Sequence, residues 1–351
     1  MSDFSVEIPG VLISVRNYLD QIRDEESVVD VNPVRFEYAD ASPDMVAVDG
    51  SHSFIFDFSG IKLAAIRVCA LTYEFVDKEL DGKIGYKLRH NLVAEHPILV
   101  SSHESFVREQ SEVYQKLLKS ARKSQLKKTH IYIANELRRY EECKLMNRVA
   151  GEVSGKILAF DGALTTPPPF LDEFAHLMED TIRLCEKNEN ILVGISKDSE
   201  THMLGQISTD EELLRKLVKT PALYYLRAEY EKTHPQPHYG DIYFAKLFPR
   251  APKWFRVDVG TFKDDPDYVF SAISHYARSE ICPGYPYPLL EAHRYVVTVR
   301  HLREMYENVV LKLAPKYGIS IEDVINGRTN IDGLRRQAFH EFLDRNSKVK
   351  P

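Results

Sequence analysis

Residues 45–75 decide the fold, because their sequence, MVAVDGSHSFIFDFSGIKLAAIRVCALTYEF, predicts three consecutive antiparallel strands. The first strand covers residues 45–48 and ends on the tripeptide DGS. The second covers residues 54–58, in which aromatic residues alternate with others, and the dipeptide SG then turns the chain. Residues 61–73 are mostly apolar and too long a run for a surface loop, so they predict a third, buried strand.

Asp49 is the informative residue of this stretch, since it follows a buried strand directly. An unpaired carboxylate is expensive to bury, so packing alone explains it poorly. One interpretation is an acid held at the rim of a sheet to bind a divalent cation. The other is a turn aspartate that closes onto Ser51 through a local hydrogen bond. The stretch by itself leaves both interpretations open.

Composition indicates an ordinary soluble globular protein of 351 residues, with 44% hydrophobic and 28% charged residues. The net charge of −6 argues against a generally basic nucleic-acid coat protein but leaves room for a local basic groove. The cysteines have no CxxC spacing, which predicts reduced thiols of a cytosolic protein and neither a zinc site nor disulfides. They are Cys69, Cys143, Cys185 and Cys282. No cationic signal sequence and no membrane-length apolar run occurs, so we expect a cytoplasmic protein.

Helical and strand-like patterns alternate along the rest of the chain and predict an α/β fold with a mixed, partly antiparallel sheet flanked by helices. The strand at residues 156–160 follows a helix, so we expect it to have a parallel partner. A single domain over residues 1–351 is the simplest organisation, with a core at about 45–300, an N-terminal helical extension over 1–44 and a C-terminal helical region over 301–351. The expected helices are 11–23, 135–153, 171–188, 211–218 and one beginning within 289–306; the further strands are 190–195, 241–248 and 254–259; the expected connections are 24–30 and 77–96.

Residues 122–128 lie within a segment, 103–140, of helical composition and form the densest basic run in the chain. A run this short is typical of a solvated helix face. The functional alternative is a loop that contacts DNA phosphates.

Asp161 ends a second apolar strand in the same Asp-Gly manner as Asp49, so the two acids are expected near each other at one rim of the sheet. Without a partner they would raise each other's pKa values, and a hard divalent ion such as Mg²⁺ or Mn²⁺ removes this conflict. A third acid is expected from the helix that precedes Asp161. The candidates are Glu136, Glu141 and Glu142.

Glu142 is the preferred third acid, since it shares a helical face with Leu145 and Met146 and should point inward. The ordinary interpretation of any glutamate on this helix is a solvated residue. Carboxylate clusters with metal ions suit phosphodiester hydrolysis. His293 and Tyr285 are candidates to act near the leaving group, against the simpler roles of a polar helix-start residue and a packed aromatic ring.

Lys197 follows the strand at residues 190–195 and is a candidate to pair with the phosphate or with a carboxylate. The segments AVDGS, LAFDGAL, VGISKDS and GYPYPLLEAH occur in this order, and together they resemble the motifs of the archaeal NurA nucleases. They occupy residues 47–51, 158–164, 193–199 and 284–293. The resemblance spans residues 45–300.

This resemblance implies an RNase H-like core and Mn²⁺-dependent (or Mg²⁺-dependent) exo- and endonucleolytic cleavage of single- and double-stranded DNA. It also implies a homodimer and a partnership with the hexameric HerA translocase in the resection of DNA double-strand breaks. Position by position, Asp49 and Asp161 match the two strand-end metal ligands, and Tyr285 and His293 match the late tyrosine and histidine. Glu142 is taken as the helical glutamate, and His293 either binds metal or handles a proton.

Two rival functions belong to other classes. An actin-like ATPase shares an RNase H-like core, and the segment FDGALTT superficially matches its phosphate loops. However, the chain has only 16 glycines and no Gly-rich adenosine loop or Walker A pattern. A non-catalytic DNA-binding adaptor would be favoured by a broken acid cluster, whereas both Asp49 and Asp161 are present.

Overall fold

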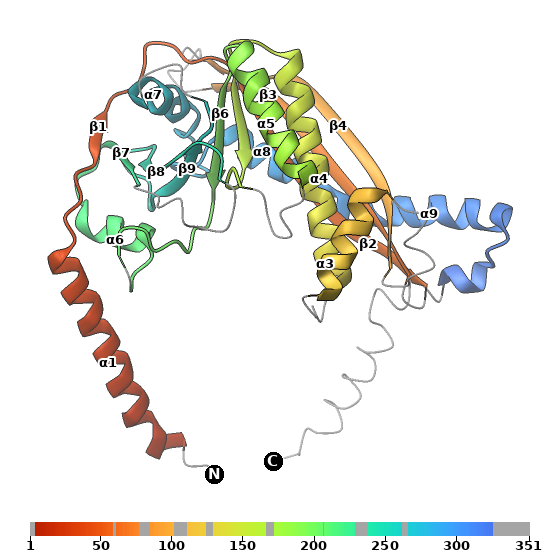
Figure 1. Cartoon of the computed structure of the whole chain (residues 1–351), viewed down its shortest axis with the longest axis horizontal. Helices are drawn as coiled ribbons and strands as arrows, with labels where there is room; N and C mark the ends of the chain where they lie inside the picture. Colours follow the sequence, from red (N-terminus) through yellow and green to blue (C-terminus); the bar gives the residue numbers. More distant parts are fainter. Residues whose placement is uncertain are drawn as a thin grey trace.

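The computed structural model describes residues 4–58, 61–76, 85–101, 111–123, 129–165, 172–205, 207–228, 238–261 and 266–325. Within these ranges one nine-stranded sheet has the order β1-β7-β8-β9-β6-β5-β2-β3-β4 (Figure 1). Its strands are β1 Val34–Phe36, β2 Met45–Phe58, β3 Ile61–Val76, β4 Gly85–Ser101, β5 Ile157–Asp161, β6 Ile191–Ser196, β7 Leu223–Arg227, β8 Asp241–Lys246 and β9 Phe255–Val259.

The sheet is mixed, as expected. β5 pairs in parallel with both β2 and β6, which confirms the parallel partner predicted for it. The other ladders, β2–β3, β3–β4, β6–β9, β8–β9, β7–β8 and β1–β7, are antiparallel. β5 therefore sits at the centre of a short parallel unit, and that unit carries the acids discussed below.

β2 corrects the prediction of two separate strands divided by a turn at the DGS tripeptide. The strand runs unbroken from Met45 to Phe58, and Asp49, Gly50 and Ser51 pair with residues of β3. The turn interpretation of Asp49 is therefore wrong: its Oδ1 accepts a hydrogen bond from the next backbone amide, that of Gly50, at 2.7 Å. Continuous pairing with β3 supplies the backbone partners that would otherwise favour a turn.

β4 is a second correction, because residues 85–96 were expected in a charged connection. The segment forms one strand, Gly85–Ser101, paired with β3 along its length. Its polar residues fit this position, since an edge strand exposes much of its surface to water.

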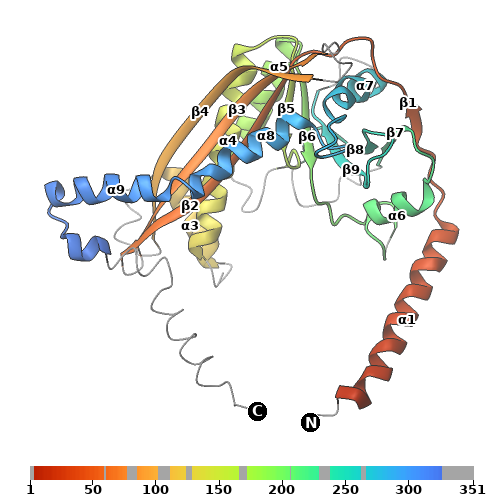
Figure 2. The ribbon, with the colours of Figure 1, turned by 180° about the vertical axis from the view of Figure 1, so that it is seen from behind.

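Helices cover both faces of the sheet. On one face α4 (Thr129–Glu152) and α5 (Asp172–Lys187) cover β2, β3, β5 and β6, with α3 (Glu112–Lys123) against α4 (Figure 1). On the other face α8 (Tyr287–Val297) crosses β2 and β3, beside α7 (Pro266–Tyr276) (Figure 2). Strand side chains alternate between these faces, which places Val46 and Val48 in the α4 cluster and Met45 and Ala47 in the α8 cluster.

The helical boundaries differ from the sequence-based ones in several places. α1 extends over Phe4–Val28, so most of the expected acidic linker is helical. The helix expected from residue 289 ends at Val297, and a 3-10 turn at Thr298–Arg300 separates it from α9 (Arg303–Leu313). A second 3-10 turn, Ala314–Tyr317, follows. β1, β7 and α7 were not predicted, whereas α6 (Asp210–Leu217) matches the expected short helix.

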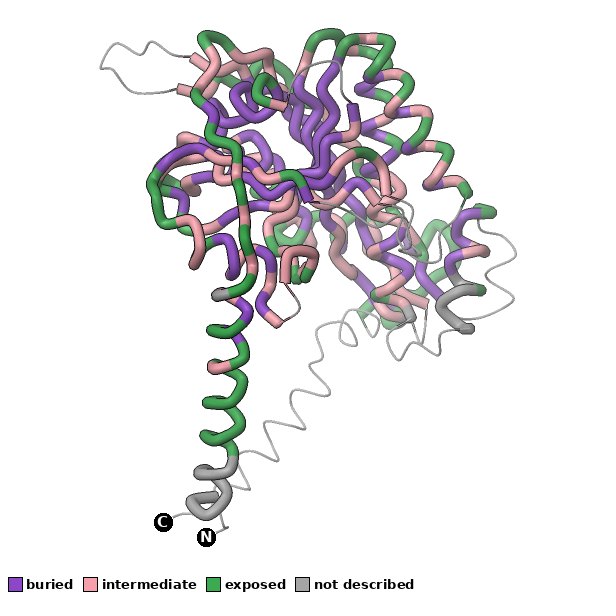
Figure 3. The backbone as a smooth tube through the Cα atoms, turned by 60° about the vertical axis from the view of Figure 1, so that its left-hand side comes forward, coloured by how far each residue is buried: buried purple, intermediate pink, exposed green. Residues whose placement is uncertain are grey.

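α1 projects from the body and is exposed over most of its described length (Figure 3). Residues 124–128 of the basic run lie outside the described part of the chain. Among the described residues, no helix combines the length and the apolar character that a membrane crossing requires.

Candidate metal centre

Asp49 and Asp161 lie side by side because of the register between β2 and β5. The last paired residues of the two strands are Val48 and Phe160, and each aspartate comes next on its own strand. The residues before them that share their orientation, Ala47 and Ala159, lie in the core under α8, so both carboxylates point to the α8 face. The carboxyl end of β5 thus creates the rim on which the two acids meet.

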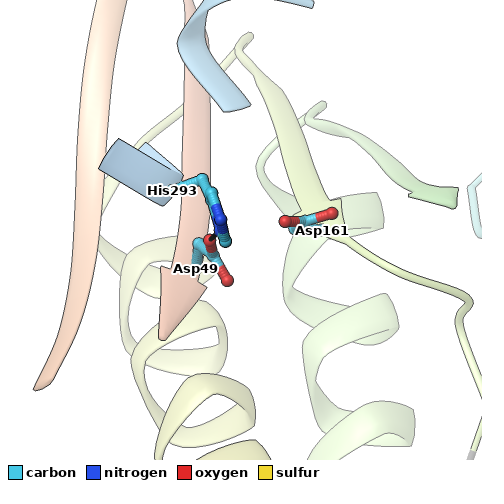
Figure 4. A group of neighbouring side chains, drawn as sticks. All are labelled: Asp49, Asp161 and His293. Atoms are coloured by element: carbon cyan, nitrogen blue, oxygen red, sulfur yellow. Dashed lines mark hydrogen bonds and ion pairs between the residues drawn. The ribbon is translucent and has the colours of Figure 1, made fainter. Parts of the chain in front are cut away.

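His293 joins this pair from α8 (Figure 4). Its Nδ1 lies 2.9 Å from Oδ2 of Asp49, and one donor atom from each of His293, Asp49 and Asp161 lies within 4.8 Å of the other two. α8 begins after Pro286 and carries Pro288 in its first turn, where a missing backbone N–H costs nothing. The histidine side chain is 46% exposed, so the group opens to solvent on this side.

Tyr285 and Lys197 both contact Asp161. The hydroxyl of Tyr285 donates to Oδ1 at 2.9 Å, and Nζ of Lys197 lies 2.5 Å from Oδ2. Lys197 follows β6, the strand next to β5, and its Nζ lies 5.7 Å from the centre of the Tyr285 ring. Both oxygens of Asp161 therefore have a partner from this chain.

Glu142 lies on the opposite face of β2, under Gly50. Gly50 is two residues after Val48 and shares its orientation toward α4. The Glu142 side chain is only 3% exposed, and its carboxylate pairs with the guanidinium of Arg138 one turn earlier on α4. The structure does not bring Glu142 into the group formed by Asp49, Asp161 and His293.

Burial and mutual repulsion shape the protonation of these groups. The pKa of Asp161 is raised mainly by desolvation and secondly by the negative charge of Asp49. The cation Lys197 and the hydrogen bond from Tyr285 lower this pKa, but by less. Burial raises the pKa of Glu142 to about 7, which outweighs the nearby cation Arg138. Burial and the Asp161 charge raise the pKa of Tyr285 well above its usual range, so this hydroxyl remains a donor at neutral pH.

The donor set fits a divalent cation. Two carboxylates and an imidazole converge within a few ångströms, and hard divalent ions take carboxylate oxygens while several transition metals also accept imidazole. Glu141 is an unsuitable third acid, since it pairs with Lys144 and lies near His96 on the outer side of α4. Glu136 is buried, and its pKa is raised by desolvation.

Arg138 is a residue beside the candidate centre that sequence reasoning did not single out. Its guanidinium pairs with Glu142 and also donates to the backbone carbonyl of Gly50 at 3.2 Å. The i, i+4 spacing of Arg138 and Glu142 was visible in the sequence, but such pairs usually lie on solvated helix faces.

The NurA domain profile matches residues 43–298 of this sequence. This range contains Asp49, Asp161 and His293 and is well over half of the chain. The chain belongs to the NurA family. No curated protein matches the sequence at a significant level.

Solved NurA structures resemble the fold at low sequence identity. The NurA nuclease from Sulfolobus solfataricus is 16% identical, with a TM-score of 0.50; the match covers 88% of this chain and 96% of that one. A NurA bound to dAMP and manganese is 12% identical, with a TM-score of 0.46 and coverages of 84% and 93%. The first likeness, together with the helix-flanked mixed sheet, confirms the predicted RNase H-like fold class of this NurA-family chain.

Proposed function

We propose that this chain is a divalent-metal-dependent deoxyribonuclease formed as one domain over residues 1–351. One observation carries the proposal: in a chain of the NurA family, Asp49 and Asp161 end up beside each other on adjacent parallel strands, with His293 facing them. Both single- and double-stranded DNA are the proposed substrates, cut by endo- and exonucleolytic hydrolysis. The same family membership disfavours an actin-like ATPase.

Asp49, Asp161 and His293 are the proposed ligands, and Mn²⁺ or Mg²⁺ the proposed ion, since these ions take carboxylate oxygens. When bound, such an ion supplies an activated water nucleophile and stabilises charge on the phosphate oxygens. Glu142 is the proposed further ligand, or a carboxylate that adds negative charge to the site from the α4 side, because its carboxylate lies against Gly50, the residue next to Asp49 in β2.

The remaining residues have proposed roles that follow from their contacts. Tyr285 orients Asp161 through its hydroxyl and keeps its own proton. Lys197 is a fixed cation beside the acids and is 34% exposed, which leaves its ammonium group accessible to a non-bridging phosphate oxygen. His293 bridges Asp49 and solvent, a position suited to ligating the ion or moving a proton.

The test of the nuclease proposal is cleavage of end-labelled single- and double-stranded DNA with Mn²⁺, with and without EDTA. The Asp161→Asn variant, purified in parallel, controls for contaminating nucleases. We expect cleavage by the wild type, none with EDTA, and a loss of at least 10²-fold in the variant. Equal cleavage by wild type and variant would contradict the proposal, and DNA binding without any cleavage would favour the adaptor function.

We further propose a cytoplasmic homodimer that acts with a HerA-type hexameric translocase in the resection of DNA double-strand breaks. The sequence has no Walker A pattern, so ATP-driven movement must come from a partner. α1 exposes Val11, Leu12 and Ile13, each 60% accessible, which is unusual for an unpartnered helix. Sedimentation of the chain alone, and ATPase assays with and without translocase, test this; robust ATPase activity of the chain alone would contradict the division of labour.

A further inference from the structure

A basic pocket of about 230 Å³ lies between α6 and the ends of β8 and β9. Four of its lining residues are cations, and no acid lines it. Trp254 forms part of the wall and is buried, with its ring stacked on Tyr224. The cations are Arg215, Lys219, Lys246 and Lys253. We refer to this set as the basic pocket.

The basic pocket lies at the same edge of the sheet as the candidate metal centre. β9 is antiparallel to both β6 and β8, so β6 and β8 run in the same direction and end at one edge. Lys246 ends β8, and Lys197 follows the end of β6. By register, Asp161 of β5 is level with Tyr243 of β8. Lys246 therefore lies three strand spacings across the sheet and three residues further along, or roughly 17 Å from Asp161.

Lys253 links the pocket to the metal centre. Its ammonium group donates to the backbone carbonyl of Lys197 and contacts Asp198 at 3.1 Å. The side chain of Lys197 in turn contacts Asp161. Lys246 shares its strand face with Ile242 and Phe244, which pack under α6, so the pocket lies around the sheet edge from Asp161.

The charges of the basic pocket are only partly compensated within the described residues. Arg215 has Glu211 at 3.7 Å and Lys253 has Asp198, whereas no described carboxylate pairs with Lys219 or Lys246. Partial burial lowers the pKa of the Lys246 ammonium group. An unpaired ammonium group that loses hydration is stabilised by an anion, and a phosphate group offers several acceptor oxygens to such a cluster.

We propose that the basic pocket binds a backbone phosphate of the DNA strand whose scissile bond lies at Asp49 and Asp161. The inference rests on the proposed nuclease function. The bound phosphate therefore lies a few nucleotides from the scissile one on the same strand. The pocket therefore fixes the direction in which the strand leaves the metal centre, along the sheet edge toward α6.

The test uses the full chain and a fluorescent single-stranded oligonucleotide in EDTA, so that binding is measured without cleavage. The variant is Lys219→Gln/Lys246→Gln, which removes two charges and keeps polar side chains of similar size. The matched control, Lys187→Gln/Lys312→Gln, removes two exposed charges from α5 and α9. Isothermal titration with inorganic phosphate is run on the same proteins.

We expect the slope of log K against log salt to fall by about 0.7 in the pocket variant, as the loss of one single-strand phosphate contact requires, and to stay at the wild-type value in the control. An unchanged slope in the pocket variant would overturn the inference. The variant could also lose inorganic phosphate binding while its slope stays unchanged. That result would mean that the pocket binds free phosphate and not DNA, and it would overturn the inference as well.

The outcomes separate this inference from the nuclease proposal. Cleavage by the wild type with an unchanged slope in the pocket variant rejects the pocket alone. A reduced slope in the pocket variant, with no Mn²⁺-dependent cleavage by the wild type, supports the pocket as a DNA contact and rejects the nuclease proposal. A wild type that does not bind the oligonucleotide rejects both.

Discussion

Gly50 and Glu142 are in direct contact across β2 and α4. A Cβ atom at position 50 would lie 2.5 Å from Oε1 of Glu142, 2.9 Å from its Cγ and 2.9 Å from Cγ1 of Val68. Because glycine has no side chain, the buried carboxylate of Glu142 occupies the space that a side chain at position 50 would fill. This contact sets the distance between Glu142 and the strand that carries Asp49.

Gly50→Ala should displace the Glu142 side chain. We expect an overpacking cost of about 1–3 kcal/mol in unfolding free energy and at least a tenfold loss of Mn²⁺-dependent cleavage. Gly151→Ala is the control, because its added methyl group meets only Leu184, at 3.8 Å, and alanine is favoured in a helix. Denaturant unfolding and cleavage rates measure the two effects; full activity in Gly50→Ala would show that Glu142 need not keep its position.

Tyr285→Phe should weaken metal binding by leaving Oδ1 of Asp161 without its donor. The expected loss is about 1–3 kcal/mol, or roughly 5- to 150-fold in Mn²⁺ affinity, with the fold retained because the ring remains. Titration calorimetry measures the affinity. Tyr268→Phe, at an exposed position on α7, serves as the control and should bind Mn²⁺ as the wild type does. Wild-type affinity in Tyr285→Phe would remove the tyrosine from the site.

Lys197→Gln should separate metal binding from catalysis. Removing this cation takes away a charge that repels the metal ion, so Mn²⁺ affinity should stay equal or increase, while kcat/KM for DNA should fall by at least tenfold. Lys197→Arg keeps the charge and should recover part of the rate. A parallel fall in metal affinity would instead assign Lys197 a structural role at Asp161.

Without metal, Glu142 should make the protein less stable as pH rises. Its pKa is about 7 in the folded state and near 4.5 in the unfolded chain, so between these values the folded state holds a proton that the unfolded state has lost. The protonated Glu142 carboxyl group contributes fully to the unfolding free energy below about pH 4.5. This contribution is lost by pH 7, which lowers the unfolding free energy by about 3 kcal/mol. Urea unfolding in EDTA at pH 5 and 7.5 measures it, and Glu142→Gln should lose most of this dependence. An equal pH dependence in wild type and variant would contradict the assignment.

The sequence correctly predicted that Asp49 and Asp161 lie at the ends of neighbouring paired segments. It was wrong about the length of β2, the strand that carries Asp49. Two apolar runs that end in Asp-Gly correctly indicated a parallel pair, because the helix before β5 requires a crossover connection. The turn predicted at the DGS tripeptide failed because glycine here serves the approach of Glu142, which lies 92 residues further along the chain. Local turn propensity carries no information about such a contact.

Long-range partners also explain the other differences. β4 has the charged composition of a loop and becomes a strand because β3 extends beyond the parallel core and offers a partner along its whole length. Arg138 resembled a solvated helix residue, and only the position of α4 over Gly50 buries its pair with Glu142. In each case the deciding neighbour lies elsewhere in the chain.

The most direct test of the central claim is a crystal structure of the Mn²⁺-soaked protein, with the ion located by anomalous scattering. We predict a peak bonded to carboxylate oxygens of both Asp49 and Asp161 and beside His293, absent from crystals of Asp161→Asn. A protein that cleaves DNA with Mn²⁺ but binds the ion away from these two aspartates would contradict the account.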